Sequence, residues 1–189
     1  MARRTLFVFV LLLFLSATVF GQSKSADIVN FLSSAYSSRS FTTAPVDSRD
    51  LDLILHCGVR APSARDSQPW HFTVVRDLTT MKKIVPDAMD GNLLIVISGL
   101  DQPDRASAIA FDCALATENM YLAAQSLGLG SHIYTGPIAS LNAKYRDLVG
   151  VPTGYVAVAI LKIGHMPQNV DAVSAASQRK TDSETIDNR

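Results

Sequence analysis

Hydrophobic residues recur along this chain at two spacings, which predict its helices and its strands. From about Arg105 to Leu127 the apolar residues stand three or four positions apart, as on the buried face of a long helix. Shorter apolar runs, such as Leu93 to Ser98, lack this period and are typical of strands buried in a sheet. The chain is therefore expected to form helices over 25–36, 47–60, 81–85, 105–127 and 138–149 and strands over 70–75, 93–98, 131–134 and 155–163.

Polar and turn residues mark where these elements begin and end. Asp47 is expected to cap the second helix, because its carboxylate accepts hydrogen bonds from N–H groups of the first turn. Pro62 disfavours helical backbone in the residue before it, so this helix ends near Arg60. Gly128 follows the longest helix, where a glycine readily takes the left-handed conformation of a helix end. From Gly164 onward the chain turns polar, and such a tail either lacks a fixed place or lies across another subunit.

The N-terminal segment, residues 1–21, has the pattern of a secretory signal peptide. Arg3 and Arg4 precede an unbroken apolar run from Leu6 to Leu15, and mostly small residues follow up to Gly21. An apolar run of this length extends only about 15 Å as a helix, roughly half of a bilayer core. Cleavage leaves a domain over 22–189 that is exported to the periplasm or secreted, without stable membrane insertion. An uncleaved N-terminal anchor is the alternative.

Charge and cysteine content limit the partners of this domain. The whole chain is neutral, with 17 basic and 17 acidic residues, so loss of Arg3 and Arg4 leaves a net charge of about −2. This balance indicates neither a nucleic-acid surface nor a polybasic membrane patch. Cys57 and Cys113 lie in helical patterns and are interpreted as buried thiols, although export also permits a disulfide.

Several common catalytic motifs are absent from the sequence. There is no G-x-S-x-G, H-E-x-x-H, Cys-x-x-Cys or Walker motif, and the histidines lack metal-ligand spacing. The stretch Gly128-Leu129-Gly130 follows a helix and lacks the third glycine of a dinucleotide fingerprint. The sequence therefore predicts no metal site, no P-loop and no Rossmann turn.

Four segments carry a resemblance to a known family. Residues 61–72, APSARDSQPWHF, resemble the APS-x-x-NSQPW-x-F segment of the nitroreductase family. Residues 37–46 are similar to the family's RRS-x-R-x-F…PV opening, residues 118–130 to its QN-x-x-LAA-x-x-LGLG segment, and residues 156–167 to its closing strand and turn. All four stand in the family's order and spacing, across roughly residues 26–182.

The resemblance implies an α+β fold in which helices flank a central mixed sheet around a long central helix. It also implies a homodimer with FMN bound in two sites between the subunits. A C-terminal tail, about 165–189, crosses to the partner subunit in such a dimer. The element order predicted from the hydrophobic pattern agrees with this fold.

The resemblance also assigns residues to an FMN site. Ser37, Arg39 and Arg179 are assigned to the phosphate, which needs cations and hydroxyls. Four loop residues of the partner subunit are assigned to the ring edge, and two residues to the region of N5, where electrons enter and leave. The edge residues are Pro62, Ser63, Ala64 and Asp66, and the N5 residues are Thr135 and Gly136. The flavin carries the chemistry, so no catalytic side chain is assigned.

Several of these residues also have a purely structural interpretation. Ser37 can serve as a helix-end cap, Arg39 and Arg179 as ordinary surface cations, and Pro62 as a residue that ends the helix and begins the loop. Trp70 is interpreted as a core residue rather than as a cofactor contact.

Two positions depart from the family pattern. The family's first arginine in the opening segment is Ala35 here, and one missing charge-assisted hydrogen bond lowers FMN affinity roughly tenfold to a hundredfold. The family's asparagine in NSQPW is Asp66, whose ionised carboxylate accepts hydrogen bonds but donates none. Its charge also opposes an anionic reduced flavin.

These features predict an FMN-dependent oxidoreductase that reduces nitroaromatics, quinones or related acceptors by a ping-pong mechanism. The family's usual reductant is NAD(P)H, a cytoplasmic donor, so an exported member needs another donor or trace nicotinamide. A non-catalytic dimer that binds flavin or another small ligand, or a dimer that has lost its cofactor, is the alternative that Ala35 and Asp66 favour.

Overall fold

The computed structural model of the protein describes residues 26–170 and 178–189. The expected signal segment, residues 1–21, lies outside the described residues. The chain divides into one unit that ends at Ala35 and a second from Tyr36 to Arg189. In the first unit, residues 26–34 form the helix expected over 25–36. Within the described ranges, no helix combines the length and the apolar character that a membrane crossing needs.

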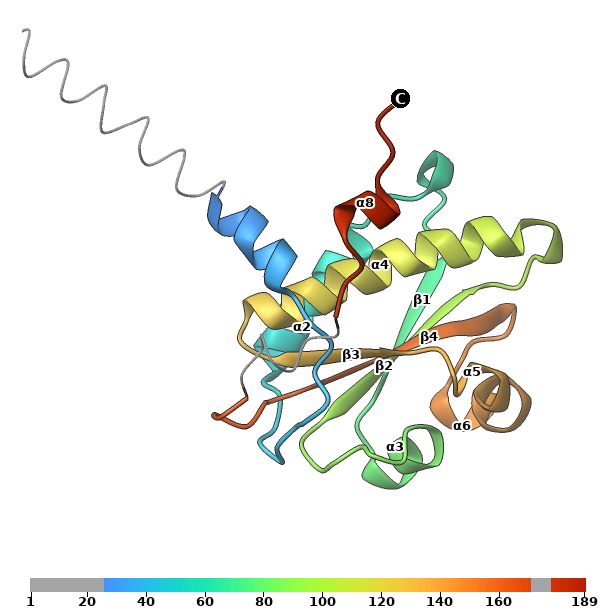
Figure 1. Ribbon diagram of the computed structural model, residues 1–189. Helices are drawn as coiled ribbons and strands as arrows, with labels where there is room; N and C mark the ends of the chain where they lie inside the picture. Colours follow the sequence, from blue (N-terminus) through green and yellow to red (C-terminus); the bar gives the residue numbers. More distant parts are fainter. Residues whose placement is uncertain (1–25, 171–177) are drawn as a thin grey trace, which may run out of the picture. The chain divides into compact units, whose positions relative to one another are not determined.

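The second unit is built on a four-stranded sheet (Figure 1). In order across the sheet, its strands are β1 (Trp70–Val75), β2 (Leu93–Leu100), β4 (Tyr155–Gly164) and β3 (Gly130–Tyr134). All four lie where the sequence predicts them. β1 and β3 are therefore the two edges of this sheet.

The expected mixed sheet is wrong for the described chain, because each neighbouring pair of strands is antiparallel. β2 and β3 run in the same direction, but β4 lies between them and pairs with both. The long apolar runs of β2 and β4, which are typical of parallel strands, arise here because helices cover both faces of the sheet.

Two helical layers cover the sheet (Figure 1). α2 (Ser48–Val59) and α4 (Ala106–Ser126) lie on one face, and α3 (Leu78–Ile84), α5 (Ile138–Ser140) and α6 (Arg146–Val149) lie on the other. α4 confirms the long helix expected over 105–127 and contacts all four strands.

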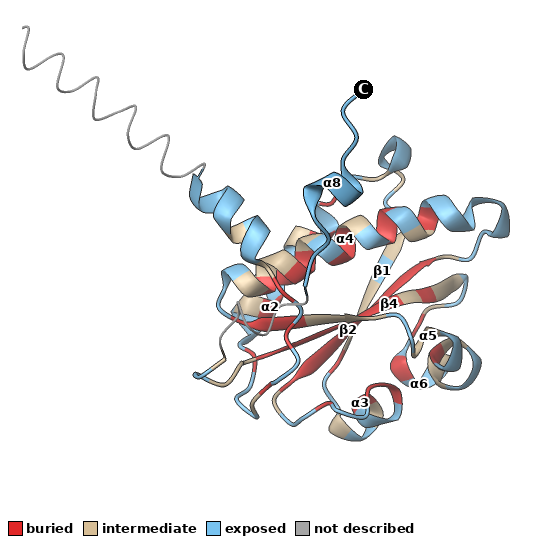
Figure 2. Ribbon diagram, viewed as in Figure 1, coloured by how far each residue is buried: buried red, intermediate tan, exposed pale blue. Residues whose placement is uncertain are grey.

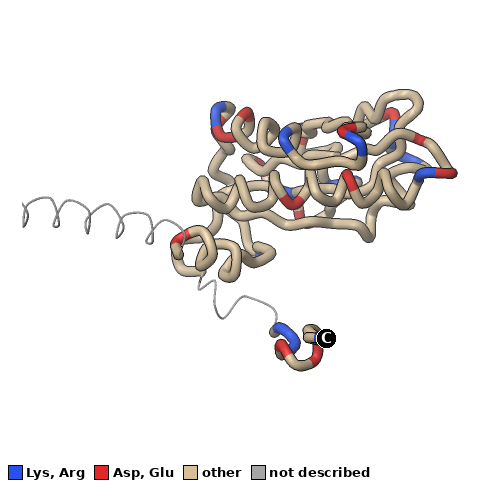
Figure 3. Tube along the Cα trace, turned by 90° about the horizontal axis from the view of Figure 1, so that it is seen from above, with Lys and Arg blue, Asp and Glu red and all other residues tan. Residues whose placement is uncertain are grey.

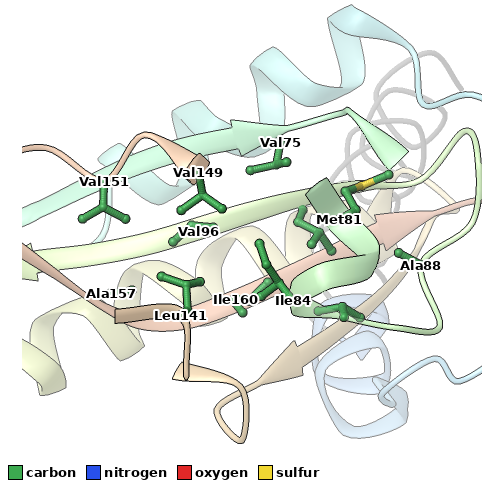
Figure 4. Close-up of a cluster of buried hydrophobic side chains, with 12 residues drawn as sticks. Val75, Met81, Ile84, Ala88, Val96, Leu141, Val149, Val151, Ala157 and Ile160 are labelled. Carbon is green, nitrogen blue, oxygen red and sulfur yellow. The ribbon is translucent and has the colours of Figure 1, made fainter. Parts of the chain in front are cut away.

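Side chains of β2 alternate between the two layers. A side chain at Gly99 would meet Ile109 of α4, whereas Leu94 and Val96 join the opposite core. This opposite core is a cluster of buried apolar side chains beneath α3 and α6 (Figure 4). Its members are Val75, Met81, Ile84, Val85, Ala88, Leu94, Val96, Leu141, Val149, Val151, Ala157 and Ile160.

Caps explain several of the helix boundaries. The carboxylate of Asp47 accepts a hydrogen bond from the Arg49 N–H at 2.7 Å, which confirms it as the cap of α2. α3 begins earlier than the expected Met81, because Asp77 caps it by accepting a bond from the Thr80 N–H at 2.7 Å. Gly128 takes the expected left-handed conformation after α4, with φ of 78°.

The single helix expected over 138–149 is wrong. The segment is divided into α5, a π-helical turn at Leu141–Tyr145, and α6. In this turn the Asn142 amide donates to the Ala157 carbonyl and accepts from the Ala157 N–H, both at 2.9 Å. These two bonds fasten the turn to β4, and a regular helix was expected because the apolar pattern does not register them.

Several residues of α4 are exposed (Figure 2). Phe111 is 65% exposed, while Met120 on the sheet side is fully buried. Leu53 and Val59 of the neighbouring α2 are exposed as well. Both helices therefore carry exposed apolar side chains.

The two cysteines, Cys57 on α2 and Cys113 on α4, are both free thiols. Burial, assisted by the nearby Asp112, raises the pKa of the Cys113 thiol to about 11. Cys113 is thus a neutral core thiol, as the sequence interpretation expects, whereas Cys57 is only partly buried.

Gly91 and Gly128 provide a matched test of the packing beside β2. Both have φ near +79°, but a Cβ at Gly91 would lie 2.2 Å from the Thr43 carbonyl oxygen, and one at Gly128 would meet nothing within 4 Å. We expect Gly91→Ala to lower the free energy of unfolding by roughly 3 kcal/mol or more and Gly128→Ala by about 1–2 kcal/mol, measured by urea unfolding. Equal losses would show that the contact between Thr43 and Gly91 does not constrain the fold.

Candidate functional site

The segment that contains Ser37 and Arg39 runs along the edge strand β3. The Ser38 N–H donates to the Ser131 carbonyl at 2.9 Å, and the Ser131 N–H donates to Ser38 Oγ at 3.3 Å. The His132 ring nitrogen Nδ1 lies 2.9 Å from the Ser38 carbonyl. These bonds hold the opening segment against β3, with Ser37 and Arg39 on either side of the buried Ser38 and both exposed.

A pocket of about 240 Å³ opens at this edge of the sheet, lined by Arg39, Asp87, His132 and Tyr134. Thr135 and Gly136 follow directly after Tyr134 and are exposed. The structure therefore brings Arg39 of the opening segment to His132 and Tyr134 of β3, next to Thr135 and Gly136 in the chain. Asp87 comes from the connection between α3 and β2, and the sequence analysis did not single it out.

Lys162 of β4 lies buried next to the pocket, with a side chain only 1% exposed. Its Nζ is 2.5 Å from Asp87 Oδ2 and stands over the rings of Phe41 and Tyr134, 4.5 and 5.5 Å from their centroids. The sequence analysis also missed this residue. A signal was present, because Lys162 is the one charged residue in the apolar run of 155–163.

Asp87 is the hub of these contacts. The Tyr134 hydroxyl donates to it at 3.0 Å in addition to the Lys162 ammonium. Partial burial by itself would raise the pKa of Asp87, but the hydrogen bonds from Lys162 and Tyr134 outweigh it and hold this pKa below its ordinary value. Asp87 is therefore an ionised carboxylate at neutral pH.

Two other pocket groups are uncharged at neutral pH. Burial, together with the charges of Arg39 and Lys162, lowers the pKa of His132 despite its bond to Ser38. Burial and the bond to Asp87 raise the pKa of Tyr134. Arg39, Lys162 and Asp87 thus leave one net positive charge at the pocket, on a chain whose acidic and basic residues are otherwise interspersed along the described trace (Figure 3).

The second group of predicted residues lies in the loop before β1. Asp112 of α4, only 2% exposed, fixes this loop by accepting hydrogen bonds from the Ala64 N–H at 3.0 Å and the Ser67 hydroxyl at 3.4 Å. Ser63 Oγ accepts a further bond from the Gln68 N–H at 3.0 Å. The sequence analysis did not assign a role to Asp112. Its place beside Cys113, on the predicted buried face of the long helix, is a signal, because a buried acid needs hydrogen-bond partners.

The same loop holds an unusual backbone. Arg65, Asp66 and Gln68 have φ of 57°, 54° and 43°, in the left-handed region that residues other than glycine seldom occupy. The Asp66 carboxylate accepts a bond from the Gln68 amide at 2.9 Å, within the loop. Such strain persists where surrounding contacts enforce it, and it concentrates at functional sites.

The two groups of predicted residues lie at opposite edges of the sheet. Ser37, Arg39, Thr135 and Gly136 adjoin β3, whereas the loop with Pro62, Ser63, Ala64 and Asp66 leads into β1. A single chain therefore assembles the first group but does not bring the loop to it. Arg179 lies in the second described range, beyond residues 171–177, and its assignment stays a prediction.

No metal-binding arrangement is evident in the parts of the chain that the structure describes. Within residues 26–170 and 178–189, no group of three His, Cys, Asp or Glu side chains is placed to hold a metal ion.

Trp70 stacks on Phe72 with ring centroids 6.4 Å apart, in line with a packing role.

An antiparallel sheet between two helical layers, ordered in this way along the chain, places the protein among α+β proteins of the nitroreductase fold. A nitroreductase with bound FMN from Bacteroides fragilis matches with a TM-score of 0.69 at 21% identity, over 86% of this chain and 98% of that one. A nitroreductase with bound FMN from Desulfitobacterium hafniense gives a TM-score of 0.69 at 20% identity, over 85% and 97% of the two chains.

Sequence similarity identifies the family. The profile of the Nitroreductase family matches residues 32–104 and 88–165. A protein of Archaeoglobus fulgidus, provisionally named an NADH dehydrogenase/NAD(P)H nitroreductase, is 30% identical over 155 residues, which cover 72% of this chain and 84% of its relative. The chain belongs to the nitroreductase family.

Asp112 gives a direct test of how the loop is held. We expect Asp112→Ala to lower the free energy of unfolding by about 1–3 kcal/mol, since two donors lose a buried acceptor. Hydrogen exchange of the Ala64 amide, followed by NMR, should accelerate in the same variant. Asp112→Asn keeps one acceptor oxygen and should show a smaller change in both measurements. Unchanged exchange at Ala64 in the alanine variant would remove Asp112 from this role.

Proposed function

We propose that the protein is an FMN-dependent oxidoreductase that passes electrons from a reductant to small organic acceptors such as nitroaromatics or quinones, by a ping-pong mechanism. Membership of the family supports this proposal, as do the NAD(P)H nitroreductase name of its relative and the FMN bound in two structures of the same fold. The observation that carries it is the pocket at β3, where Arg39 of the opening segment meets His132 and Tyr134.

The residues at this pocket fit an FMN molecule. Arg39 supplies a cation and Ser37 an exposed hydroxyl, the two kinds of group that a phosphate needs. A side chain at Gly136 would meet nothing within 4 Å, so the backbone of Thr135 and Gly136 is open to a close-lying ring. When bound, the flavin supplies the electron transfer, and the protein binds it, orients it and sets the local field.

We also propose a homodimer with one such site for each chain. The loop with Pro62, Ser63, Ala64 and Asp66 lies at the sheet edge opposite Arg39, so a second copy is the source of a loop for the ring edge. The exposed Phe111, Leu53 and Val59 on α4 and α2 supply apolar surface for this contact. In such a dimer the tail after Gly164 reaches the partner, where Arg179 joins the phosphate.

Export is the third part of the proposal, and residues 1–21 are its support. The basic start, the apolar run from Leu6 to Leu15 and the small residues after it have the pattern of a cleaved leader. Outside the cytoplasm the protein needs a donor other than abundant NAD(P)H. The donor is therefore the variable to screen once flavin binding is established.

A non-catalytic flavin- or ligand-binding dimer is the second candidate function. Ala35, where the family has arginine, favours it because one phosphate cation is lost. Asp66 favours it as well, since its carboxylate already accepts a hydrogen bond from the Gln68 amide and adds negative charge to the loop. Turnover of bound flavin by any reductant separates the two candidates.

Arg39 is the residue on which FMN retention should depend most. After incubation with FMN and desalting, the wild-type protein should show the two visible absorption bands of oxidised flavin. Arg39→Ala should weaken FMN binding at least about tenfold, because a charge-assisted bond to the phosphate is lost. Arg76→Ala, which removes an exposed arginine beyond β1, is the matched control. A colourless wild-type protein would refute the flavin proposal, and equal binding by Arg39→Ala would remove this residue from the site.

The purified secreted form tests export and assembly together. Its N-terminal sequence should begin near Gln22, and light scattering should give the mass of two chains. A chain that still begins at Met1 would contradict cleavage of the leader, and the mass of one chain would contradict the homodimer.

A further inference from the structure

The ion pair of Lys162 and Asp87 is unusual for its place in the fold. Lys162 belongs to a strand whose neighbouring residues, Leu161 and Ile163, are apolar and fully buried. Only Lys162 is buried in this pair, since the Asp87 side chain is 56% exposed. Taking the ammonium out of water costs free energy that its attraction to a half-exposed carboxylate returns only in part. An apolar residue at position 162 would serve packing at least as well, so stability alone does not account for the lysine.

The geometry shows what the pair does to the pocket. Asp87 lines the pocket and its side chain is 56% exposed, while Lys162 approaches it from the buried side. Arg39 lines the same pocket, and an unpaired carboxylate there would offset its positive charge. Lys162 neutralises Asp87 from below, so the charge of Arg39 stays available to a ligand.

Lys162, Asp87 and Tyr134 hold fixed charges and hydrogen bonds, and they are not arranged to exchange protons. Both Lys162 and Tyr134 donate to Asp87, so its carboxylate is held as an acceptor. The rings of Phe41 and Tyr134 flank the ammonium and restrict its movement. Among the other groups of the pocket, His132 is neutral, and Arg39 is the charge that a ligand meets.

We propose that Lys162 is the positioning residue that keeps this pocket selective for an anionic group, by pinning and neutralising Asp87 beside Arg39. This inference rests on the proposed function, in which the anionic group is the phosphate of FMN. The net positive charge of the pocket then depends on Lys162, which the sequence did not assign to the site. This residue also explains how a chain with Ala35 in place of an arginine keeps a net positive pocket.

The test compares the affinities of FMN and of riboflavin, which has the same ring but no phosphate, by flavin fluorescence at low salt. Lys162→Met should weaken FMN binding on the order of tenfold, because Asp87 is then unpaired and cancels Arg39. The double variant Asp87→Asn with Lys162→Met removes both charges and should recover FMN affinity to within about threefold of the wild type. Riboflavin affinity should change less than about threefold in both variants, because this ligand is neutral.

Two controls separate charge from folding. Lys82→Met removes an exposed lysine from α3 and should leave FMN affinity within about threefold of the wild type. Urea unfolding should show that the double variant is about as stable as the wild type, because it leaves no buried charge without a partner.

Three results would overturn the inference while leaving the proposed function intact. They are wild-type FMN affinity in Lys162→Met, failure of the double variant to recover, and an equal loss of riboflavin affinity, which would point to pocket shape. A wild-type protein that binds no FMN would overturn the proposed function and this inference together, and that measurement comes first.

Discussion

Burial of the sheet on both faces is the constraint on which the rest of the structure depends. β2 and β4 are apolar along nearly their whole length, so each needs a helical layer above and below. α4 supplies one layer by crossing all four strands, and α3, α5 and α6 supply the other. The inner strands are thus enclosed, and both groups of candidate residues lie at an edge of the sheet.

The separation of these two groups has a structural consequence. Arg39 and Tyr134 meet at β3, while Asp112 holds the strained loop of Arg65 and Asp66 near β1. A rigid loop presented away from its own chain's pocket suits a contact with another molecule better than it suits packing within the chain. On α4, Phe111 is a further apolar side chain that is largely exposed in the described chain.

At the pocket beside β3, one buried side chain changes the net charge that the surface residues present. Arg39 and Asp87 viewed alone are an exposed cation and a half-exposed carboxylate with little net effect. Lys162 beneath them shifts the balance to one net positive charge, and Tyr134 fixes the carboxylate that it neutralises.

The sequence by itself determined most of the elements and the family, because these depend on local patterns, while its assignment of the first group of residues to a cofactor stays a prediction. Periodic apolar residues, the Asp47 cap and Gly128 act within one turn or strand, and the conformations found there are those predicted. Only the tertiary structure decided the antiparallel pairing, the break at Leu141–Tyr145 and the roles of Asp87, Asp112 and Lys162. Each of these depends on a partner far away in the chain: Lys162 meets Asp87 across 75 residues, and Asp112 meets Ala64 across 48. A local pattern carries no information on which distant group will face a side chain, and burial between two layers makes that group decisive.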